Sequence, residues 1–444
     1  MEGTRVSLYT GFVDLDDHKT LMFNFPRHVA DIIERSHADL MRDGRHVDLP
    51  SSMAQYTKEV GYLTEAAEED EIAWFSGRVQ SIEDLDKNSK AAIVSVIPTN
   101  TCNFACSYCF QANTGMRNLQ DRHFEEEQAP AVISMIDSLL QHRGVNHLEL
   151  FGGEPLLPKT LPFVRRIVLA GEERGLPTRV TTNGFHLGMF RELLGKTRIH
   201  DLQISLDGSP EEHDKRRIPL SGAPTFDRIL ENILLAIAQG ASVFIRPNID
   251  ARNISSIPKL VAVLRERGLL DSEQVKFQCV SVVPDPLTPD HGQGHTIPQS
   301  QVDDAVAEAL GTTPAPNALS RLLSQWMARP LTYACGAPNR NVYLSPEGAV
   351  YNCHELVGRP EAAIGNFSRS GALKLLPVAA SWSGRRIDHL ENCRRCPLAY
   401  AHGGGCAARM SVASLGRFGN CGDFPEEFES QVRNAYGEST RATG

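Results

Sequence analysis

Three cysteines between residues 102 and 109 have a spacing that can do metal chemistry. Cys102, Cys106 and Cys109 form a CxxxCxxC pattern. Three thiolates at this spacing can hold one small inorganic cluster and leave a fourth coordination position for another molecule. The alternatives are a structural zinc site, which usually takes four protein ligands, and a set of buried thiols. The spacing favours an iron–sulfur cluster over zinc.

The remaining cysteines are also clustered. Of the 10 cysteines in the chain, Cys279 stands alone, and the last six lie between Cys335 and Cys421. In a cytoplasmic protein such clusters indicate metal binding more than disulfides. Residues 335–421, within the C-terminal part 311–444, have many turn-forming residues and few long apolar runs, so we expect metal binding to supply part of the folding energy there.

Length and charge limit the classes of function. A chain of 444 residues should form two or three domains. Its net charge of −9 provides no basic face for nucleic acid and opposes binding to an anionic membrane surface. The first residues show no secretory signal, and no apolar run is long enough to cross a bilayer. We therefore expect a cytoplasmic protein with neither a nucleic-acid nor a membrane partner.

The elements that must position the first three cysteines alternate between strand and helix. We expect strands at 92–97, 147–151, 178–182, 201–205, 242–249 and 274–283, and helices at 125–142, 158–174, 225–239 and 255–267. Such alternation predicts an α/β fold with a parallel sheet. The steps are too few to close an eight-fold barrel, so we expect an open, partial (β/α)6 barrel over residues 89–310. Its active site should lie where the strands end.

Residues 1–88 precede this alternation and contain no cysteine. The pattern predicts a hairpin of strands at 6–13 and 19–24, followed by helices at 28–41 and 51–60. Two interpretations stay open. The segment is either a packing extension of the main domain or a docking module that adds a guest peptide strand to its sheet edge.

Three motifs together resemble the radical S-adenosylmethionine (SAM) superfamily. They are the CxxxCxxC loop, the turn Gly152–Pro155 and the segment Ser205–Gly208, within residues 91–283. The resemblance implies that Cys102, Cys106 and Cys109 hold a 4Fe–4S cluster whose fourth iron is chelated by SAM. One electron then cleaves SAM, and the resulting 5′-deoxyadenosyl radical takes a hydrogen atom from the substrate. A reductant such as flavodoxin or ferredoxin would supply the electron.

The resemblance also suggests which residues contact SAM. An aromatic ring offers stacking area, glycines allow close backbone approach, and carboxylates accept charge-assisted hydrogen bonds. The assignments are Tyr108 to the adenine, Gly152 and Gly153 to close approach, Glu154 to the ammonium group, Ser205 and Asp207 to the ribose hydroxyls, and Arg217 or Arg246 to the carboxylate. For both arginines a solvated surface charge is the alternative.

The C-terminal cysteines resemble the SPASM extension of the same superfamily, which holds two auxiliary Fe–S clusters. By position, one cluster would use Cys335, Cys353 and Cys406, with a fourth site open to substrate, water or another residue. The other would use Cys393, Cys396, Cys421 and position 402, where this chain has His402 and the family has cysteine. Imidazole can ligate iron in Fe–S centres, so His402 is either a ligand or a bystander.

Two further residues are candidates for catalysis. His354 directly follows Cys353 and is either an orienting or acid–base group or a polar loop residue. Cys279 lies in the last predicted strand. Most lone cysteines are small core residues, and the alternative is a hydrogen-atom donor of the kind an epimerase needs.

The combined reading is a maturase of ribosomally made peptides (a RiPP enzyme). Residues 5–85 resemble the winged-helix-like domain with which such maturases recognise a precursor peptide. The expected reaction is an oxidative cross-link: a thioether, C–C, C–O or C–N bond. The alternatives are a sulfatase-type protein maturase, a peptide epimerase and a small-molecule radical SAM dehydrogenase. A non-catalytic Fe–S carrier or zinc protein is disfavoured by the motifs at 152–155 and 205–207, because a carrier has no need for SAM.

Overall fold

The computed structural model describes residues 3–85, 92–106, 108–109, 111, 122–282, 295–312, 318–411 and 414–441. The chain divides into two compact units. Unit 1 comprises Met1–Ser89, Ala315–Pro338 and Ala380–Gly444, and unit 2 comprises Lys90–Pro314 and Asn339–Ala379. The domain limits expected from the sequence stay predictions, and the limit at 88–89 lies outside the described residues.

Unit 2 is built on the predicted parallel sheet. Its six barrel strands are β6 (Ala92–Val96), β7 (Val145–Leu150), β8 (Thr178–Thr182), β9 (Ile199–Ile204), β10 (Ser242–Ile245) and β12 (Val275–Phe277). Each pairs in parallel with its neighbour, in the order β12-β10-β9-β8-β7-β6. Mostly β-branched and leucine side chains form these strands, and the α/β fold with a mostly parallel sheet is confirmed.

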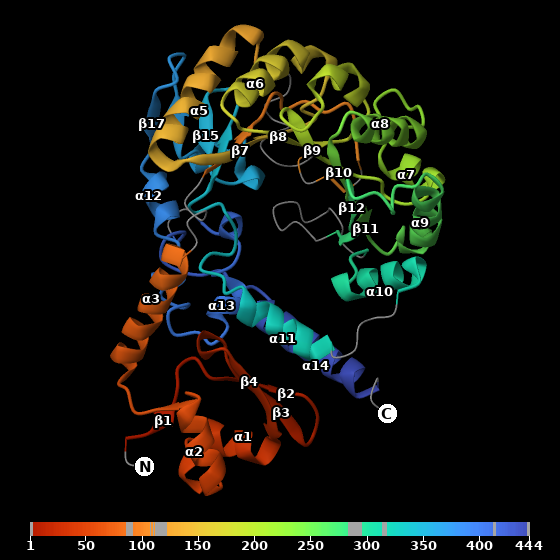
Figure 1. Ribbon diagram of the computed structural model, residues 1–444. Coiled ribbons are helices and arrows are strands. Elements are labelled where there is room, and N and C mark those ends of the chain that lie inside the picture. Colours follow the sequence, from red (N-terminus) through yellow and green to blue (C-terminus); the bar gives the residue numbers. More distant parts are fainter. Residues whose placement is uncertain are drawn as a thin grey trace. The chain divides into compact units, whose positions relative to one another are not determined.

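Helices cover the outer face of this sheet (Figure 1). They are α5 (Ala129–Arg143), α6 (Leu161–Glu173), α8 (Phe226–Ala238) and α9 (Ile257–Glu266), close to the predicted ranges. Alternate strand residues such as Val94, Leu148 and Leu202 are fully buried. The intervening positions are more polar, with Ser95 opposite Glu149 and Arg179 opposite Asp201. One face of the sheet therefore forms the core, and the other is the polar inner face of the partial barrel.

Four further strands continue the sheet beyond β6. Strand β14 (Asn341–Leu344) pairs in parallel with β6, and β15 (Ala349–Tyr351), β16 (Gly365–Phe367) and β17 (Leu373–Leu375) follow in antiparallel order. At the other end the predicted strand 242–249 is broken. Pro247 lacks a backbone N–H, and the chain resumes as β11 (Asn248–Ile249), which pairs with β13 (Val280–Ser281).

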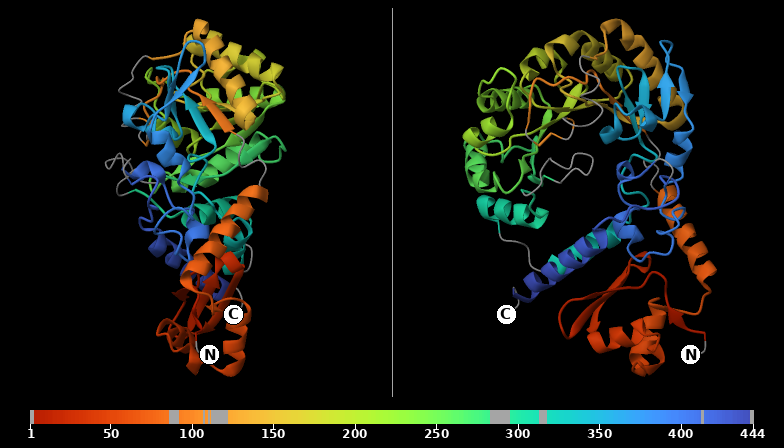
Figure 2. Two further views of the ribbon diagram at one scale, coloured as in Figure 1. Left: turned by 90° about the vertical axis from the view of Figure 1, so that its left-hand side faces the viewer. Right: turned by 180° about the vertical axis from the view of Figure 1, so that it is seen from behind.

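The N-terminal segment of unit 1 contains a three-stranded antiparallel sheet, visible from two further directions in Figure 2. Its strands are β2 (Gly11–Asp14), β3 (Lys19–Asn24) and β4 (Val29–Glu34), and a short pair, β1 (Arg5–Val6) with β5 (Leu63–Thr64), lies outside it. The predicted hairpin is confirmed from Gly11 onward, whereas Val6, expected in its first strand, pairs with Leu63 instead. The helix expected at 28–41 is wrong in its first half, because Val29–Glu34 pairs along its length with β3. Only α1 (Arg35–Arg42) is helical there.

The rest of unit 1 is mainly helical. It contains α2 (Ser51–Glu59), α3 (Glu68–Leu85), α11 (Ala318–Ala328) and α14 (Phe424–Arg441). The N-terminal and C-terminal parts share one apolar core, in which Phe25 and Trp326 both pack against Phe428. The N-terminal part has a second apolar cluster of its own, in which Met22, Met41 and Tyr62 are buried. Among the helices that the structure describes, none combines the length and apolarity that a membrane span requires.

Candidate active site

The predicted site residues follow the carboxyl ends of the barrel strands. The cysteine loop follows β6, Gly152–Pro155 follows β7, Asn183 follows β8, Ser205–Asp207 follows β9, and Arg246 and Asn248 follow β10. Because the strands are parallel, these ends meet at one edge of the sheet. The arrangement brings together residues that are far apart in the sequence.

The three cysteine thiols lie near one another and near Glu154. Burial, followed by the charges of Glu154, Cys106 and Cys109, raises the pKa of Cys102 to about 12. Burial also raises the pKa of Cys106 to about 11, although the nearby Arg217 lowers it. Such thiols lose their protons only when a cation or metal compensates the charge. Within the described ranges, no three His, Cys, Asp or Glu side chains are grouped so as to hold a single metal ion.

The turn after β7 packs directly on the start of the cysteine loop. The Gly153 N–H donates to Thr99 O at 3.1 Å, and the Glu154 N–H donates to Thr101 O at 2.9 Å. A Cβ atom on Gly153 would lie 2.3 Å from Thr101 O, and one on Gly152 would lie 2.7 Å from Thr99 O. The close approach that these glycines allow is thus to the backbone that leads into Cys102.

Glu154 is buried, with 2% of its surface exposed, and joins two strand ends. Its Oε1 accepts from the Leu156 N–H at 2.9 Å and from Thr182 Oγ1 at 2.6 Å, and its Oε2 accepts from the Asn183 N–H at 2.7 Å. Burial raises the pKa of Glu154, and these three hydrogen bonds act against that rise. A carboxylate has about four acceptor positions, so one remains for an ammonium donor.

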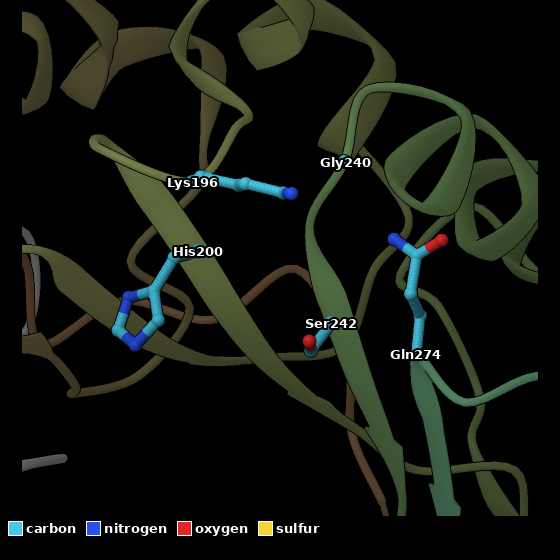
Figure 3. Close-up of a pocket in the computed structure, with 5 residues that line it drawn as sticks. All are labelled: Lys196, His200, Gly240, Ser242 and Gln274. Atoms are coloured by element: carbon cyan, nitrogen blue, oxygen red, sulfur yellow. The ribbon is translucent and has the colours of Figure 1, made fainter.

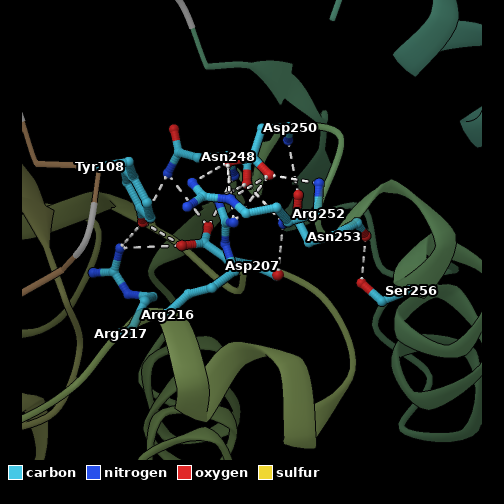
Figure 4. A network of polar contacts seen from close by, with 9 residues as sticks. All are labelled: Tyr108, Asp207, Arg216, Arg217, Asn248, Asp250, Arg252, Asn253 and Ser256. Carbon is cyan, nitrogen blue, oxygen red and sulfur yellow. Dashed lines mark hydrogen bonds and ion pairs between the residues drawn. The ribbon is translucent and has the colours of Figure 1, made fainter. Parts of the chain in front are cut away.

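A second cluster of polar side chains surrounds the Tyr108 hydroxyl (Figure 4). That hydroxyl contacts the Asp207 carboxylate and accepts hydrogen bonds from Arg217 Nη1 at 2.5 Å and Asn248 Nδ2 at 3.2 Å. Asn248 Nδ2 also reaches Ser205 Oγ at 3.4 Å, and Arg246 Nη1 reaches Asn248 Oδ1 at 3.5 Å. The residues predicted to contact SAM outside the turn at 152–154 are therefore neighbours.

Arg217 is buried in this cluster. Its exposed fraction is 7%, and its guanidinium forms a 3.6 Å ion pair with Asp207, which has no exposed surface. Burial lowers the pKa of Arg246, and the nearby Tyr108 and Asp207 partly offset this decrease. Of the two arginines predicted as partners of a carboxylate, Arg217 thus contacts the Tyr108 hydroxyl directly and Arg246 reaches the cluster through Asn248.

Several residues of this network were missed from the sequence. Arg216 Nη1 contacts both Asp250 carboxylate oxygens at 3.1 Å, and its guanidinium lies 5.2 Å from the centroid of the Tyr108 ring. Asn253 Nδ2 donates to the backbone oxygens of Asp207 and Asn248, each at 2.9 Å. Polar residues directly after a strand were the available signal. For Asn248 this signal is hidden, because residues 242–249 have the pattern of one continuous strand, and Arg216 follows no strand.

His213 supports the loop that carries Asp207. Its Nδ1 accepts from the Asp207 N–H at 3.2 Å, and its Nε2 contacts Thr225 Oγ1 at 3.2 Å. Burial, reinforced by the charge of Arg217, lowers the pKa of His213 to about 4. A neutral imidazole is needed for the first hydrogen bond, because a protonated ring has no acceptor.

The two catalytic candidates lie in different surroundings. Cys279 is buried in an apolar cluster with Ile249, Ile257 and Val302, and burial raises its pKa to about 12. The His354 ring packs against Phe151, at 5.5 Å between centroids. Partial burial lowers the pKa of His354, and the charge of Glu149 acts in the opposite direction. Roles for both residues stay predictions.

In unit 1, three of the predicted auxiliary ligands are neighbours. Burial raises the pKa of Cys393 to about 12, and the charges of Cys421 and Cys396 contribute to this rise. Asn392 Nδ2 reaches Cys421 Sγ at 3.6 Å. A Cβ on Gly419 would lie 2.4 Å from Cys393 Sγ, so this glycine makes room for the thiol. The Gly419 backbone therefore packs closely against the Cys393 thiol, and a cluster held by these three sulfurs stays a prediction.

The other predicted auxiliary ligands are less completely described. The His402 ring stacks on Phe424 with 4.3 Å between centroids, and none of its described contacts joins it to Cys393, Cys396 or Cys421. Cys335 and Cys406 belong to unit 1, and the buried Cys353 belongs to unit 2. Whether they share a cluster stays a prediction.

A cavity of about 480 Å³ lies elsewhere in unit 2 (Figure 3). Its lining residues are Lys196, His200, Gly240, Ser242 and Gln274. They stand at the amino ends of β9, β10 and β12. This cavity is thus at the edge of the sheet opposite the candidate site.

Comparisons with known proteins agree with this geometry. Residues 96–262 match the model of the radical SAM superfamily. A protein of Agrobacterium fabrum named GTP 3′,8-cyclase is 26% identical over 209 residues, which are 44% of this chain and 57% of that protein. The chain spans 55 to 64% of the length of the first three curated relatives.

Solved structures share the fold. SuiB from Streptococcus suis bound to S-adenosylmethionine superposes with a TM-score of 0.53 and 15% identity, covering 94% of this chain and 99% of that one. The structure of anSMEcpe with bound AdoMet and a peptide superposes with a TM-score of 0.50 and 15% identity, covering 79% of this chain and 99% of that one. From the family match and the strand-end geometry we conclude that residues 96–262 form a radical SAM domain and that the chain is an enzyme, which implies a 4Fe–4S cluster and SAM as cofactors.

Proposed function

We propose that this enzyme modifies a ribosomally made precursor peptide and installs an oxidative cross-link in it. The observation that supports the proposal most is the extent of the fold similarity. SuiB bound to the precursor peptide SuiA matches 94% of this chain with a TM-score of 0.51, so the similarity extends well beyond the barrel. A fold shared over residues on both sides of the barrel favours a substrate of the same class.

At the strand ends we assign Cys102, Cys106 and Cys109 to the cluster. Together the cluster and SAM, when bound, supply hydrogen-atom abstraction. The residues around them fit this pair of cofactors. The thiols act on one another electrostatically, Glu154 keeps one acceptor position, and the Gly152–Gly153 turn packs against the backbone that leads into Cys102.

Around SAM, the role of each residue follows from its chemistry. The Tyr108 ring offers a stacking surface for adenine, and Glu154 accepts from the ammonium group. Ser205 and Asp207 accept from the ribose hydroxyls, while Arg217, with Arg246 beside it, pairs with the carboxylate. The Tyr108 hydroxyl now contacts both Asp207 and Arg217, so SAM would take over part of those contacts.

We assign the remaining cysteines to two auxiliary clusters. Cys393, Cys396 and Cys421 hold one of them, with His402 as the fourth ligand, and Cys335, Cys353 and Cys406 hold the other. His354, next to Cys353, is the candidate acid–base group, and Cys279 is a hydrogen-atom donor only if the product is an epimer. Flavodoxin or ferredoxin is the proposed electron donor.

Residues 1–88 are the proposed peptide-recognition domain, 89–310 the barrel and 311–444 the SPASM-type domain.

Strand β4 pairs only with β3 among the described strands, so its other edge presents backbone groups that can pair with a peptide strand. Ile32 on this strand is 46% exposed. Ile32→Asp should weaken precursor binding by about tenfold, the effect of losing roughly 1.4 kcal/mol of apolar contact. It should leave SAM cleavage unchanged. A point variant is preferable to deletion, since the N-terminal part shares its core with Phe428 and Tyr400.

A second candidate is a radical SAM enzyme acting on a small molecule. It is favoured by the relatives named GTP 3′,8-cyclase, which match 41 to 56% of this chain. The two candidates differ in substrate. If the enzyme is a small-molecule GTP cyclase, incubation with GTP, SAM and dithionite consumes GTP; if it modifies a peptide, GTP is not consumed.

The deciding experiment is co-expression with peptides encoded beside the gene, followed by mass spectrometry. A cross-link removes two hydrogens, so the peptide should lose about 2 Da, whereas epimerisation leaves the mass unchanged. The variant with Cys102, Cys106 and Cys109 replaced by Ala is the control and should leave the peptide unmodified. Consumption of GTP with no change in any encoded peptide would reject the proposal.

A further inference from the structure

A buried arginine lies between the cysteines of unit 1. Arg385 has 2% of its surface exposed. Its Nη1 donates to Leu415 O at 2.8 Å and Phe418 O at 3.0 Å and contacts Met410 Sδ at 2.9 Å. Its Nη2 donates to Gly404 O at 2.7 Å and Gly405 O at 3.0 Å.

These contacts tie two cysteine-bearing loops together. Gly404 and Gly405 immediately precede Cys406, and Leu415 and Phe418 lie in the loop that leads to Cys421. The three consecutive glycines 403–405 all have positive φ, between 65° and 82°, so the loop bends where its carbonyls meet the guanidinium. Arg385 therefore holds the backbone on which both cysteines are placed.

The charge of Arg385 has no carboxylate partner among these contacts. Every acceptor is a carbonyl or a thioether, and all are neutral. The groups that act on the guanidinium electrostatically are the thiols of Cys393, Cys406 and Cys335. A buried charge is costly unless an opposite charge compensates it. The neighbouring arginine, Arg386, shows the usual solution, because it pairs with Asp388 and Glu83.

We propose that Arg385 is the positioning residue and counter-charge of the auxiliary clusters, shared by the Cys393 set and the Cys335–Cys406 set. This inference rests on the proposed clusters. Cysteine thiolates are anionic, so a cluster that they hold supplies the negative charge that Arg385 lacks. Net charge and hydrogen bonding set the potentials of Fe–S centres. A fixed buried cation stabilises the more negative, reduced state and so raises the reduction potential of both clusters.

The test uses the full chain with Cys102, Cys106 and Cys109 replaced by Ala, so that only auxiliary clusters remain. Iron and sulfide are counted, and reduction potentials are measured by EPR-monitored titration, in this background and with Arg385→Gln, Arg385→Lys or Arg417→Gln added. Arg417 is the matched control: its side chain is 66% exposed and is paired with Glu391 in the same unit.

In the background protein we expect about eight irons per chain, four for each cubane. Absence of iron would reject the auxiliary clusters themselves, whatever the result for Arg385. With Arg385→Gln the equilibrium constant for one-electron reduction should fall at least tenfold, which corresponds to about 59 mV. Arg417→Gln should leave it unchanged, and Arg385→Lys, which keeps the charge, should stay within threefold of the background.

Two results would overturn the counter-charge role. One is a potential for Arg385→Gln equal to that of Arg417→Gln. The other is an equal change, or equal loss of iron, with Lys and with Gln. If Arg385→Gln does not load iron, the lysine variant decides: a potential near that of the background supports the proposal, and a tenfold fall or a loss of iron contradicts it.

Discussion

Replacing Glu154 with Gln tests both the geometry and the proposed role of the turn after β7. The three hydrogen bonds to its carboxylate come from two backbone N–H groups and one hydroxyl. The Thr182 hydroxyl can rotate to donate or accept, so it adapts to an amide. The N–H groups of Leu156 and Asn183 cannot, and they face different oxygens. In either orientation, the amide NH₂ of Gln opposes one of them.

The magnitude follows from that mismatch. A hydrogen bond to a charged group contributes about 1.5–3 kcal/mol, so Glu154→Gln should lower the free energy of unfolding of unit 2 by about 2 kcal/mol. At roughly 2–4 °C per kcal/mol for a domain of this size, the melting temperature should fall by about 4–8 °C. Loss of the acceptor for the ammonium group should weaken SAM binding by about tenfold or more.

The assay is calorimetry of thermal unfolding, with SAM titration of the reconstituted protein. The control is Glu231→Gln on the exposed side of α8, which should change stability by less than about 0.5 kcal/mol. A variant as stable as this control would refute the hydrogen-bond geometry. Normal SAM affinity in a destabilised variant would refute the role of Glu154 in binding SAM and leave it a structural carboxylate.

Three further changes have defined outcomes. Gly153→Ala would place a Cβ 2.3 Å from Thr101 O, so iron loading at Cys102–Cys109 should fall strongly. The control Gly77→Ala, in open space on α3, should stabilise the protein by about 0.5–1 kcal/mol. Equal iron contents in the two variants would be inconsistent with the packing at Gly153. Asn248→Ala removes contacts to Tyr108, Ser205 and Asp207, and SAM affinity should fall about tenfold with little change in melting temperature; unchanged affinity would exclude a positioning role. Burial lowers the pKa of His213 from 6.5 to about 4, so as pH falls the unfolded chain binds a proton before the folded chain does. The free energy of unfolding should therefore decrease between about pH 6.5 and pH 4, by up to about 3 kcal/mol. Urea unfolding should show this slope in the wild type and not in His213→Gln, and equal slopes would rule out His213 as its source.

The barrel could be predicted because its signals are local. Runs such as Ala92–Val96 are apolar and β-branched, and the polar motifs at 152–155 and 205–207 stand where those runs end. The same dependence on local pattern explains why Ser205 and Asp207, which follow a predicted strand, were found and Asn248 was not.

The remaining features depend on partners distant in sequence. Val29–Glu34 has helical periodicity, and its pairing with β3 overrides that pattern. Strand β14 joins β6 through residues 93 and 341, and no local signal predicts such a pair. Arg385 looks like any surface arginine until the carbonyls around it are known.

The most direct test of the central claim is release of 5′-deoxyadenosine. Protein reconstituted anaerobically with iron and sulfide is incubated with SAM and dithionite, and the nucleoside is measured by liquid chromatography and mass spectrometry. We predict that the wild type forms 5′-deoxyadenosine and that the variant with Cys102, Cys106 and Cys109 replaced by Ala forms none. Equal amounts from the two proteins would contradict the assignment of SAM chemistry to these three cysteines.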